Sequence, residues 1–149
     1  ARREPVQIYI NAKYHQFAVD EAIKQYGLDV SAVNGKVAYS ADTDGEGLTL
    51  KDGTVTIGDD AFTTSGWLAS SIGHEALHAE QIRDGRFNDT SQGVAMNEVE
   101  AYDWEIRNAD RFGLSEAEKA TINRRRDTKY GRLSDDNKAR ADQGNYTVP

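Results

Sequence analysis

Two histidines lie four residues apart in the sequence, His74 and His78, and the residue after the first of them is Glu75. Residues four apart on an α-helix share one face, so both imidazoles can reach the same metal ion. Neutral imidazole nitrogens bind Zn²⁺ at about 2.0–2.1 Å each. Glu75 lies beside that face, where its carboxylate can take a proton from a water molecule without binding the metal. The H-E-x-x-H spacing therefore predicts a zinc site with an adjacent general base.

A catalytic zinc site needs a third protein ligand and one open position. The chain has no cysteine, and its only other histidine, His15, is far upstream. A carboxylate from a downstream helix is the natural source, and Glu98 and Glu100 are the two candidates. They are two residues apart and point to different sides of a helix, so only one of them is expected to face the metal.

Residues 74–78 and 97–98 resemble the gluzincin metallopeptidases, thermolysin among them, in which a glutamate on the second helix completes the zinc site. Residues 98–101 are also similar to the Glu-x-x-Ala segment that carries this ligand in several membrane-associated gluzincins. The resemblance implies an enzyme that hydrolyses peptide bonds with Zn²⁺ as its cofactor. It implies three metal ligands and one catalytic base, which are His74, His78 and Glu98, and Glu75.

The sequence departs from the gluzincin pattern at Tyr102, where those families often have an aspartate that supports a zinc histidine. The support is expected from another side chain, with Asp103 and Asn97 as candidates. Amide hydrolysis also needs a second electrophile for the tetrahedral oxyanion. The sequence leaves several candidates open for this role, which are Tyr102, Tyr130, His15 and the three arginines at 124–126.

A second resemblance concerns the setting of the enzyme. Residues 66–75 and 96–102 are similar to the C-terminal toxin domains of bacterial polymorphic toxins, such as those of rearrangement-hotspot (Rhs) proteins. This resemblance implies an effector that is secreted, or delivered into a target cell, as part of a larger carrier. Its partners would be a protein or peptide substrate and a cognate immunity or inhibitor protein. Residues 1–5 have no initiating Met and no apolar stretch after them, so we expect no signal peptide in this chain.

Composition limits the alternatives. A length of 149 residues predicts a single domain, and 38% hydrophobic and 29% charged residues are typical of a folded protein with a modest core. The absence of cysteine excludes disulfides and thiolate ligands. A net charge of −7 opposes binding to nucleic acid or anionic membrane, and no apolar run is long enough to span a bilayer. A local basic run at 124–132 is interpreted as a solvated helix face.

The elements that must position the site begin with a predicted strand over 6–10 and a helix over 13–26, ended by Gly27. Further strands are expected over 36–40, 48–50 and 55–57. Asp52-Gly53 between the last two is typical of a tight hairpin, so we expect a small antiparallel sheet. An edge of this hairpin can pair with an extended peptide, although a purely structural hairpin is the interpretation we favour.

Helical patterns dominate the rest of the chain. We expect helices over 66–83 and 94–112, a third that starts at the Ser115–Glu118 capping box, and a short one after Ser134. Five residues of the first helix are expected to face the core, which are Trp67, Leu68, Ile72, Leu77 and Ile82. Gln81, one turn beyond His78, can line the cleft or be exposed, and exposure is the expectation we favour. The order of elements predicts an α+β fold with a small antiparallel sheet packed on helices. The resemblance to the gluzincins implies that this helical core is zincin-like and contains the HExxH active-site helix.

Two other functions fit the same motif. One keeps the metal and changes the substrate, so that the enzyme is a zinc amidase on a non-protein amide such as peptidoglycan. The other is a non-catalytic metal-binding interaction module, which a closed four-ligand site would favour. Contact with nucleic acid through the basic run at 124–132 is disfavoured by the overall acidity.

Overall fold

The computed structural model describes residues 14–149, and the strand predicted over 6–10 lies outside this range. The first described helix, α2, spans His15–Tyr26 and confirms the prediction for this segment. It ends at Gly27, whose φ of 60° places it in the left-handed region, while the Leu28 amide donates to the Ile23 carbonyl. This is the Schellman arrangement that glycine favours at a helix end.

Three short strands follow, β1 (Ala38–Tyr39), β2 (Gly47–Thr49) and β3 (Val55–Ile57), in the spatial order β1-β3-β2. The β2–β3 hairpin is antiparallel as predicted, and Gly53 in its turn has a φ of 87°. The expectation of an all-antiparallel sheet is wrong, because β1 pairs in parallel with β3. The chain reverses between β1 and β2, and the hairpin then inserts β3 between them, so β3 runs in the direction of β1.

Among the described residues, four α-helices follow the sheet: α3 (Ser65–Arg83), α4 (Ser91–Asn108), α5 (Glu116–Tyr130) and α6 (Asp135–Asp142). Each is preceded by a hydroxyl residue whose side chain accepts a hydrogen bond from an amide of the first turn, and these caps are Thr64, Thr90, Ser115 and Ser134. The capping box at Ser115 and Glu118 is present as predicted. The helix predicted over 94–112 starts and ends earlier, as α4. A single 3₁₀ turn, Asp59–Ala61, precedes α3.

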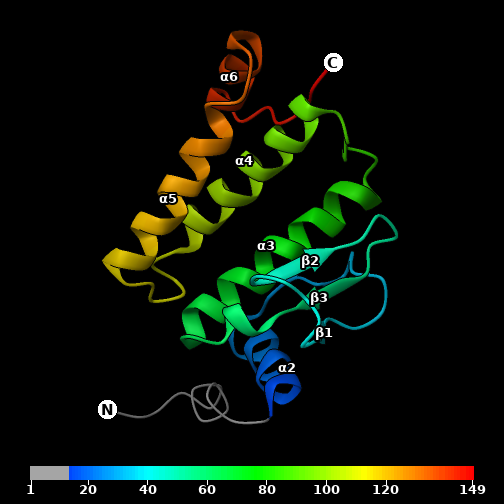
Figure 1. Cartoon of the computed structure of the whole chain (residues 1–149), viewed down its shortest axis with the longest axis vertical. Coiled ribbons are helices and arrows are strands. Elements are labelled where there is room, and N and C mark those ends of the chain that lie inside the picture. Colours follow the sequence, from blue (N-terminus) through cyan, green and yellow to red (C-terminus); the bar gives the residue numbers. More distant parts are fainter. Residues whose placement is uncertain (1–13) are drawn as a thin grey trace.

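Helix α3 lies at the centre of the molecule, with the sheet on one side and α4 and α5 on the other (Figure 1). Its buried residues cover most of its circumference, as expected for a helix enclosed by other elements. Trp67, Leu68, Ile72 and Leu77 are buried as predicted, whereas Ile82 is half-buried. These elements form an α+β fold. No described helix has the length and apolar character needed to cross a membrane.

A glycine brings α4 close to α3. A Cβ atom at Gly73 would lie 1.9 Å from the Trp104 ring, so only a residue without a side chain allows this contact. Gly73 immediately precedes His74, and the close approach brings the carboxylates of α4 within reach of the two histidines. The packing of α4 on α3 therefore builds the site described next.

Candidate metal centre

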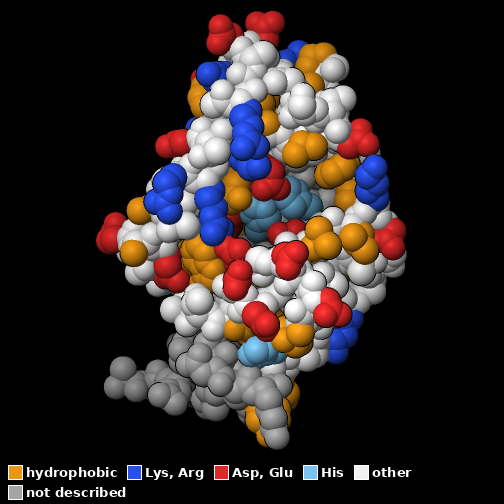
Figure 2. Space-filling model, in the orientation of Figure 1, with side chains coloured by type: hydrophobic (Ala, Val, Ile, Leu, Met, Phe, Trp, Pro, Cys, Tyr) orange, Lys and Arg blue, Asp and Glu red, His pale blue; other side chains and the backbone are white. Residues whose placement is uncertain are grey.

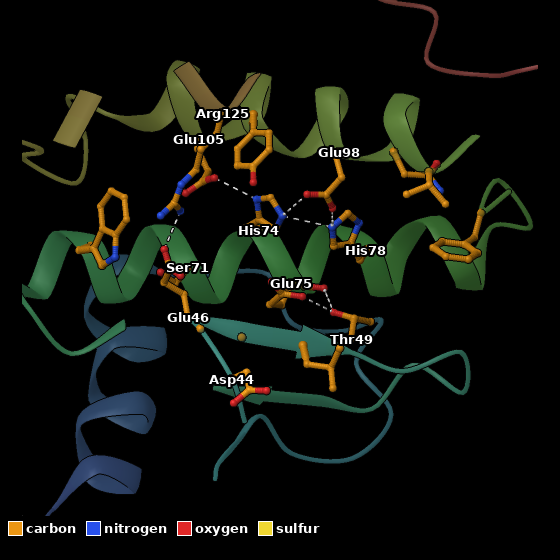
Figure 3. A pocket seen from close by; sticks show the side chains of 18 residues that line it. Asp44, Glu46, Thr49, Ser71, His74, Glu75, His78, Glu98, Glu105 and Arg125 are labelled. Carbon is orange, nitrogen blue, oxygen red and sulfur yellow. Dashed lines mark hydrogen bonds and ion pairs between the residues drawn. The ribbon is translucent and has the colours of Figure 1, made fainter. Parts of the chain in front are cut away.

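Three side chains from two helices converge on one point. His74 and His78 extend from α3 and Glu98 from α4, and one ligand atom from each lies within 4.8 Å of the others (Figure 3). The Nε2 atoms of the two imidazoles are 3.2 Å apart, and His74 Nε2 is 3.5 Å from Glu98 Oε2. The other carboxylate oxygen of Glu98 contacts His78 Nε2. This group could hold a metal ion, and two imidazoles with one carboxylate are an ordinary ligand set for a transition metal.

The other candidate ligand, Glu100, points away from this group. Its Oε1 accepts a hydrogen bond from Gln81 Nε2 at 3.0 Å and forms an ion pair with Arg86 Nη1 at 2.8 Å. A separation of two residues on α4 turns the side chains of Glu98 and Glu100 to different sides of the helix. Of the two glutamates, only Glu98 is in the metal-binding group.

The ring of His74 is oriented by a carboxylate that sequence reasoning did not select. Glu105 Oε2 lies 2.9 Å from His74 Nδ1, and the Ser70 hydroxyl contacts the other oxygen of Glu105. All three side chains are buried. Asp103, one of the predicted candidates for this role, is instead paired with Arg126. The available signal was the spacing of seven residues between Glu98 and Glu105, which puts both on one face of α4.

The ring of His78 is oriented by an amide. Gln81 Oε1 lies 2.8 Å from His78 Nδ1, and Gln81 Nε2 donates to the backbone carbonyl of Asn97 at 3.1 Å. Gln81 is fully buried, so the expectation that it is exposed is wrong. Asn97, the other predicted candidate for a supporting role, takes part through its backbone only. In both histidines Nδ1 is thus hydrogen-bonded to a protein side chain, and Nε2 faces the point where the three side chains of the metal-binding group converge.

Charge around the two imidazoles favours a cation between them. Burial would lower the pKa of His74, but its hydrogen bonds to the Glu105 and Glu98 carboxylates outweigh this effect and raise the pKa well above 6.5. Burial would raise the pKa of Glu98, but hydrogen bonds from His74 and His78 hold it far below the ordinary value of 4.5. In the absence of a metal, a proton on His74 supplies the positive charge that these carboxylates attract.

Glu75 lies next to the metal-binding group without belonging to it. Its carboxylate oxygen Oε1 accepts a hydrogen bond from the Thr49 hydroxyl at 2.9 Å (Figure 3). Thr49 is on β2, so the sheet and helix α3 meet at this side chain. Glu75 is half-buried and lines the same pocket as the two histidines. A carboxylate beside a metal site and open to solvent is positioned for proton transfer.

The pocket has a volume of about 390 Å³ and contains the two histidines at its base, visible in the central hollow of the surface (Figure 2). Helix α3 forms its floor, β2 one wall and α4 the other. Three exposed apolar side chains line it, which are Leu48, Phe87 and Val94. Arg125, Glu46 and Trp67 line it as well. Arg125 Nη1 is 2.6 Å from Glu46 Oε1, so an ion pair links α5 to the loop before β2.

The structure separates the candidates for oxyanion stabilisation. Tyr102 and Arg125 line the pocket, and the Tyr102 ring centroid is 4.8 Å from that of His74. Tyr130 instead bonds to Asp142 through its hydroxyl, and the His15 ring is stacked on Phe62.

The basic run is only partly a solvated face. Arg124 is exposed, but Arg125 and Arg126 are half-buried and pair with Glu46 and Asp103.

Burial, followed by the negative charges of Glu98 and Glu105, raises the pKa of Tyr102, so its phenol keeps its proton.

Comparisons of this chain with protein-family models, curated proteins and solved structures gave no match in any of the three. The metal-binding group and the pocket around it are therefore the observations from which a function can be inferred.

Proposed function

We propose that this protein is a zinc-dependent peptidase of the gluzincin type, with His74, His78 and Glu98 as metal ligands and Glu75 as general base. One observation carries the proposal: Glu75 lies beside the three-ligand group, outside it, on the floor of an open pocket. A purely structural metal site is closed by four protein ligands, whereas a catalytic one has three and an exchangeable position. Within residues 14–149 the metal-binding group has three members.

The residues fit zinc in particular. Two imidazoles and one carboxylate, without a thiolate, match the donors of catalytic zinc sites, and both imidazoles have the hydrogen-bonded Nδ1 that such ligands usually have. When bound, Zn²⁺ supplies Lewis-acid polarisation of the scissile carbonyl and increases the acidity of water. A compact, zincin-like arrangement of α3, α4 and β2 is part of this proposal.

The chain's own residues account for the proton transfers. The Glu75 carboxylate takes a proton from the attacking water and passes it to the leaving nitrogen as the C–N bond breaks. The Tyr102 phenol, which lines the pocket beside His74, donates a hydrogen bond to the oxyanion that develops on the carbonyl oxygen. Arg125 is less suited to this task, because its guanidinium is already paired with Glu46.

An extended peptide is the proposed substrate. Strand β2 is at the edge of the sheet and forms a wall of the pocket, so its free backbone groups can pair with a peptide that crosses the metal site. The exposed side chains of Leu48, Phe87 and Val94 in the pocket lining provide an apolar surface for a substrate side chain. Cleavage within a chain, as by an endopeptidase, fits a pocket that is open to solvent.

The test uses protein purified without added metal. We would measure its metal content and its hydrolytic activity on two substrates, a mixture of denatured proteins and cell-wall fragments. The proposal expects one zinc per chain and cleavage of the proteins, both lost on chelation. The Glu75→Gln variant should bind zinc and remain folded, yet lose hydrolysis by several orders of magnitude. Near-normal activity of Glu75→Gln would overturn the general-base assignment. Cleavage of the cell-wall fragments alone would make the enzyme an amidase on a non-protein amide.

The same residues support a biological setting. Residues 66–75 and 96–102, which resemble Rhs-type toxin domains, contain two of the three proposed ligands, His74 and Glu98, and the proposed base, Glu75. We propose that the chain is the peptidase part of a secreted or delivered effector, opposed by an immunity protein that covers the pocket. Production of the wild-type chain inside bacteria should stop growth, and Glu75→Gln should remove the effect. Equal growth with both chains would contradict this setting without affecting the proposed chemistry.

A further inference from the structure

We infer that Thr49 is a positioning residue for Glu75: its hydroxyl, together with the space left by Gly47, holds the Glu75 carboxylate at the metal site. The inference rests on the proposed function, because it assigns the base of that reaction a partner on another element. Thr49 and Gly47 are on β2, whereas Glu75 is on α3. Neither residue belongs to the H-E-x-x-H pattern.

The first observation is a pair of hydrogen bonds from one hydroxyl. Thr49 Oγ1 lies 2.9 Å from Glu75 Oε1 and 2.9 Å from the backbone carbonyl oxygen of Glu75. A threonine hydroxyl has a single proton, so these two acceptors share it. The contact with the backbone fixes the strand relative to the helix, and the contact with Oε1 fixes the carboxylate relative to the strand. The other carboxylate oxygen, Oε2, has no hydrogen-bond partner within residues 14–149.

The second observation is the closeness of β2 to Glu75. A Cβ atom at Gly47 would lie 2.8 Å from Cγ of Glu75 and 3.3 Å from its carboxylate carbon. Residues 47 and 49 are two apart on a strand and point to the same face, so both face α3. The φ angle of Gly47 is not positive, and its role is therefore steric. Any side chain at this position would push Glu75 away from the place where Thr49 binds it.

These two contacts have a consequence for catalysis. A glutamate has three rotatable side-chain bonds, and Glu75 is half-buried, so the helix alone does not fix its carboxylate. Strand β2 restricts it by packing against the aliphatic part and by binding one oxygen, which leaves Oε2 for the proton of the attacking water. A misplacement of about 1 Å in a catalytic group can cost roughly 100-fold in rate. The hydroxyl of Thr49 should thus affect turnover more than substrate binding or metal content.

The kinetic test compares Thr49→Val, which keeps the shape and removes the hydroxyl, with Thr49→Ser, which keeps the hydroxyl. Thr56→Val is the matched control, because Thr56 is on the neighbouring strand and its hydroxyl bonds to Thr43. We expect Thr49→Val to lose about 10- to 100-fold in kcat with KM and zinc content unchanged. Thr49→Ser and Thr56→Val should stay within about threefold of wild type. A normal kcat in Thr49→Val, or an equal loss in Thr49→Ser, would overturn the inference.

A structural measurement decides the inference even if no peptide substrate is found. Crystal structures of the zinc-loaded wild type and of Thr49→Val report the position of the Glu75 carboxylate directly. We expect one ordered rotamer in the wild type and a rotated or multiple carboxylate in Thr49→Val and in Gly47→Ala. An unchanged carboxylate in both variants refutes the positioning role. Absence of any hydrolysis by the wild type would refute the proposed function instead, so the two failures are distinguishable.

Discussion

Nδ1 of His74 and Oε2 of Glu105 lie 2.9 Å apart, and both side chains are buried. A carboxylate at this distance fixes the orientation of the ring and leaves Nε2 as the atom directed at the metal-binding group. Glu105 is itself held by Ser70, so the chain Ser70–Glu105–His74 runs from one turn of α3 through α4 and back to α3. Helix α4 thus contributes one member of the metal-binding group, Glu98, and orients another, His74.

The first prediction follows from this relationship. Substitution Glu105→Gln removes the carboxylate that holds Nδ1–H of His74 and makes Nε2 a stronger donor to a metal, so zinc affinity should fall by about 10- to 100-fold. Competition with a chelator of known affinity measures the change. Asp103→Asn is the control, because Asp103 is on the same helix but pairs with Arg126. Equal affinity in Glu105→Gln and the wild type would show that this carboxylate does not support the site.

The second prediction distinguishes the two candidate ligands on α4. Glu98→Ala should abolish stoichiometric zinc binding, because it removes one of three ligands. Glu100→Ala should keep one zinc per chain with an affinity reduced by at most about tenfold, because Glu100 acts only through Gln81, which orients His78. Metal analysis after gel filtration measures both. Loss of zinc from Glu100→Ala alone would contradict the ligand assignment.

The third prediction concerns pH. The pKa of His74 in the metal-free fold lies above its ordinary value of 6.5, so protonation of His74 stabilises this fold. This stabilisation is complete below about pH 6.5 and is lost as the pH rises through the raised pKa. Zinc requires the neutral ring and must displace that proton, so its affinity should rise with pH over the same range. The increase in Tm on adding zinc should therefore be larger at pH 8 than at pH 6.

Calorimetry in buffers of different ionisation enthalpy tests the same linkage, because each zinc bound should release about one proton from His74 near neutral pH. The depressed pKa of Glu98 sets the lower pH limit for the interaction of its carboxylate with the two histidines in the metal-free fold. Its contribution to stability is present above about pH 4.5 and is lost as the pH falls through the depressed value. A zinc-induced change in Tm that is independent of pH between 6 and 8 would argue against a protonated His74.

The local parts of this structure could be predicted from the sequence, and the parts that depend on tertiary packing could not. Spacing alone placed His74 and His78 on one helix face and put Glu98 and Glu100 on opposite sides of the next helix. The roles of Gln81 and Glu105 depend on the distance between α3 and α4, which the Gly73–Trp104 contact sets. No local pattern encodes that distance.

In the sheet, too, the local pairing could be predicted from the sequence and the long-range pairing could not. The Asp52-Gly53 turn fixes an antiparallel pair because the two strands are adjacent in sequence. The position of β1 beside β3 depends on the route of the chain between β1 and β2, and a strand of two residues has no periodicity that would reveal it. The contact between Thr49 and Glu75 could not be predicted from the sequence for a similar reason, since the two residues are on different elements.

The fourth prediction tests the contact that sets the helix spacing. Gly73→Ala places a methyl group where the Trp104 ring now lies, and overpacking of this kind costs about 1–3 kcal/mol. The free energy of unfolding in urea should fall by that amount, and zinc affinity should fall with it because α4 moves relative to α3. Gly131→Ala, at the helical end of α5 with a φ of −61°, is the control and should be nearly neutral. Unchanged stability in Gly73→Ala would mean that Trp104 has another position available.

The fifth prediction separates the tyrosine at the pocket from one outside it. If the Tyr102 phenol donates to the oxyanion, Tyr102→Phe should lower kcat by about 10²- to 10³-fold, the usual effect of removing one such donor. Zinc content and KM should change little, because the ring and its contact with His74 remain. Tyr130→Phe makes the same chemical change where the hydroxyl bonds to Asp142, and it should leave kcat unaltered. Similar turnover in both variants would transfer the electrophilic role to Arg125, the other candidate that lines the pocket, and Arg125→Lys would then be the variant that loses activity.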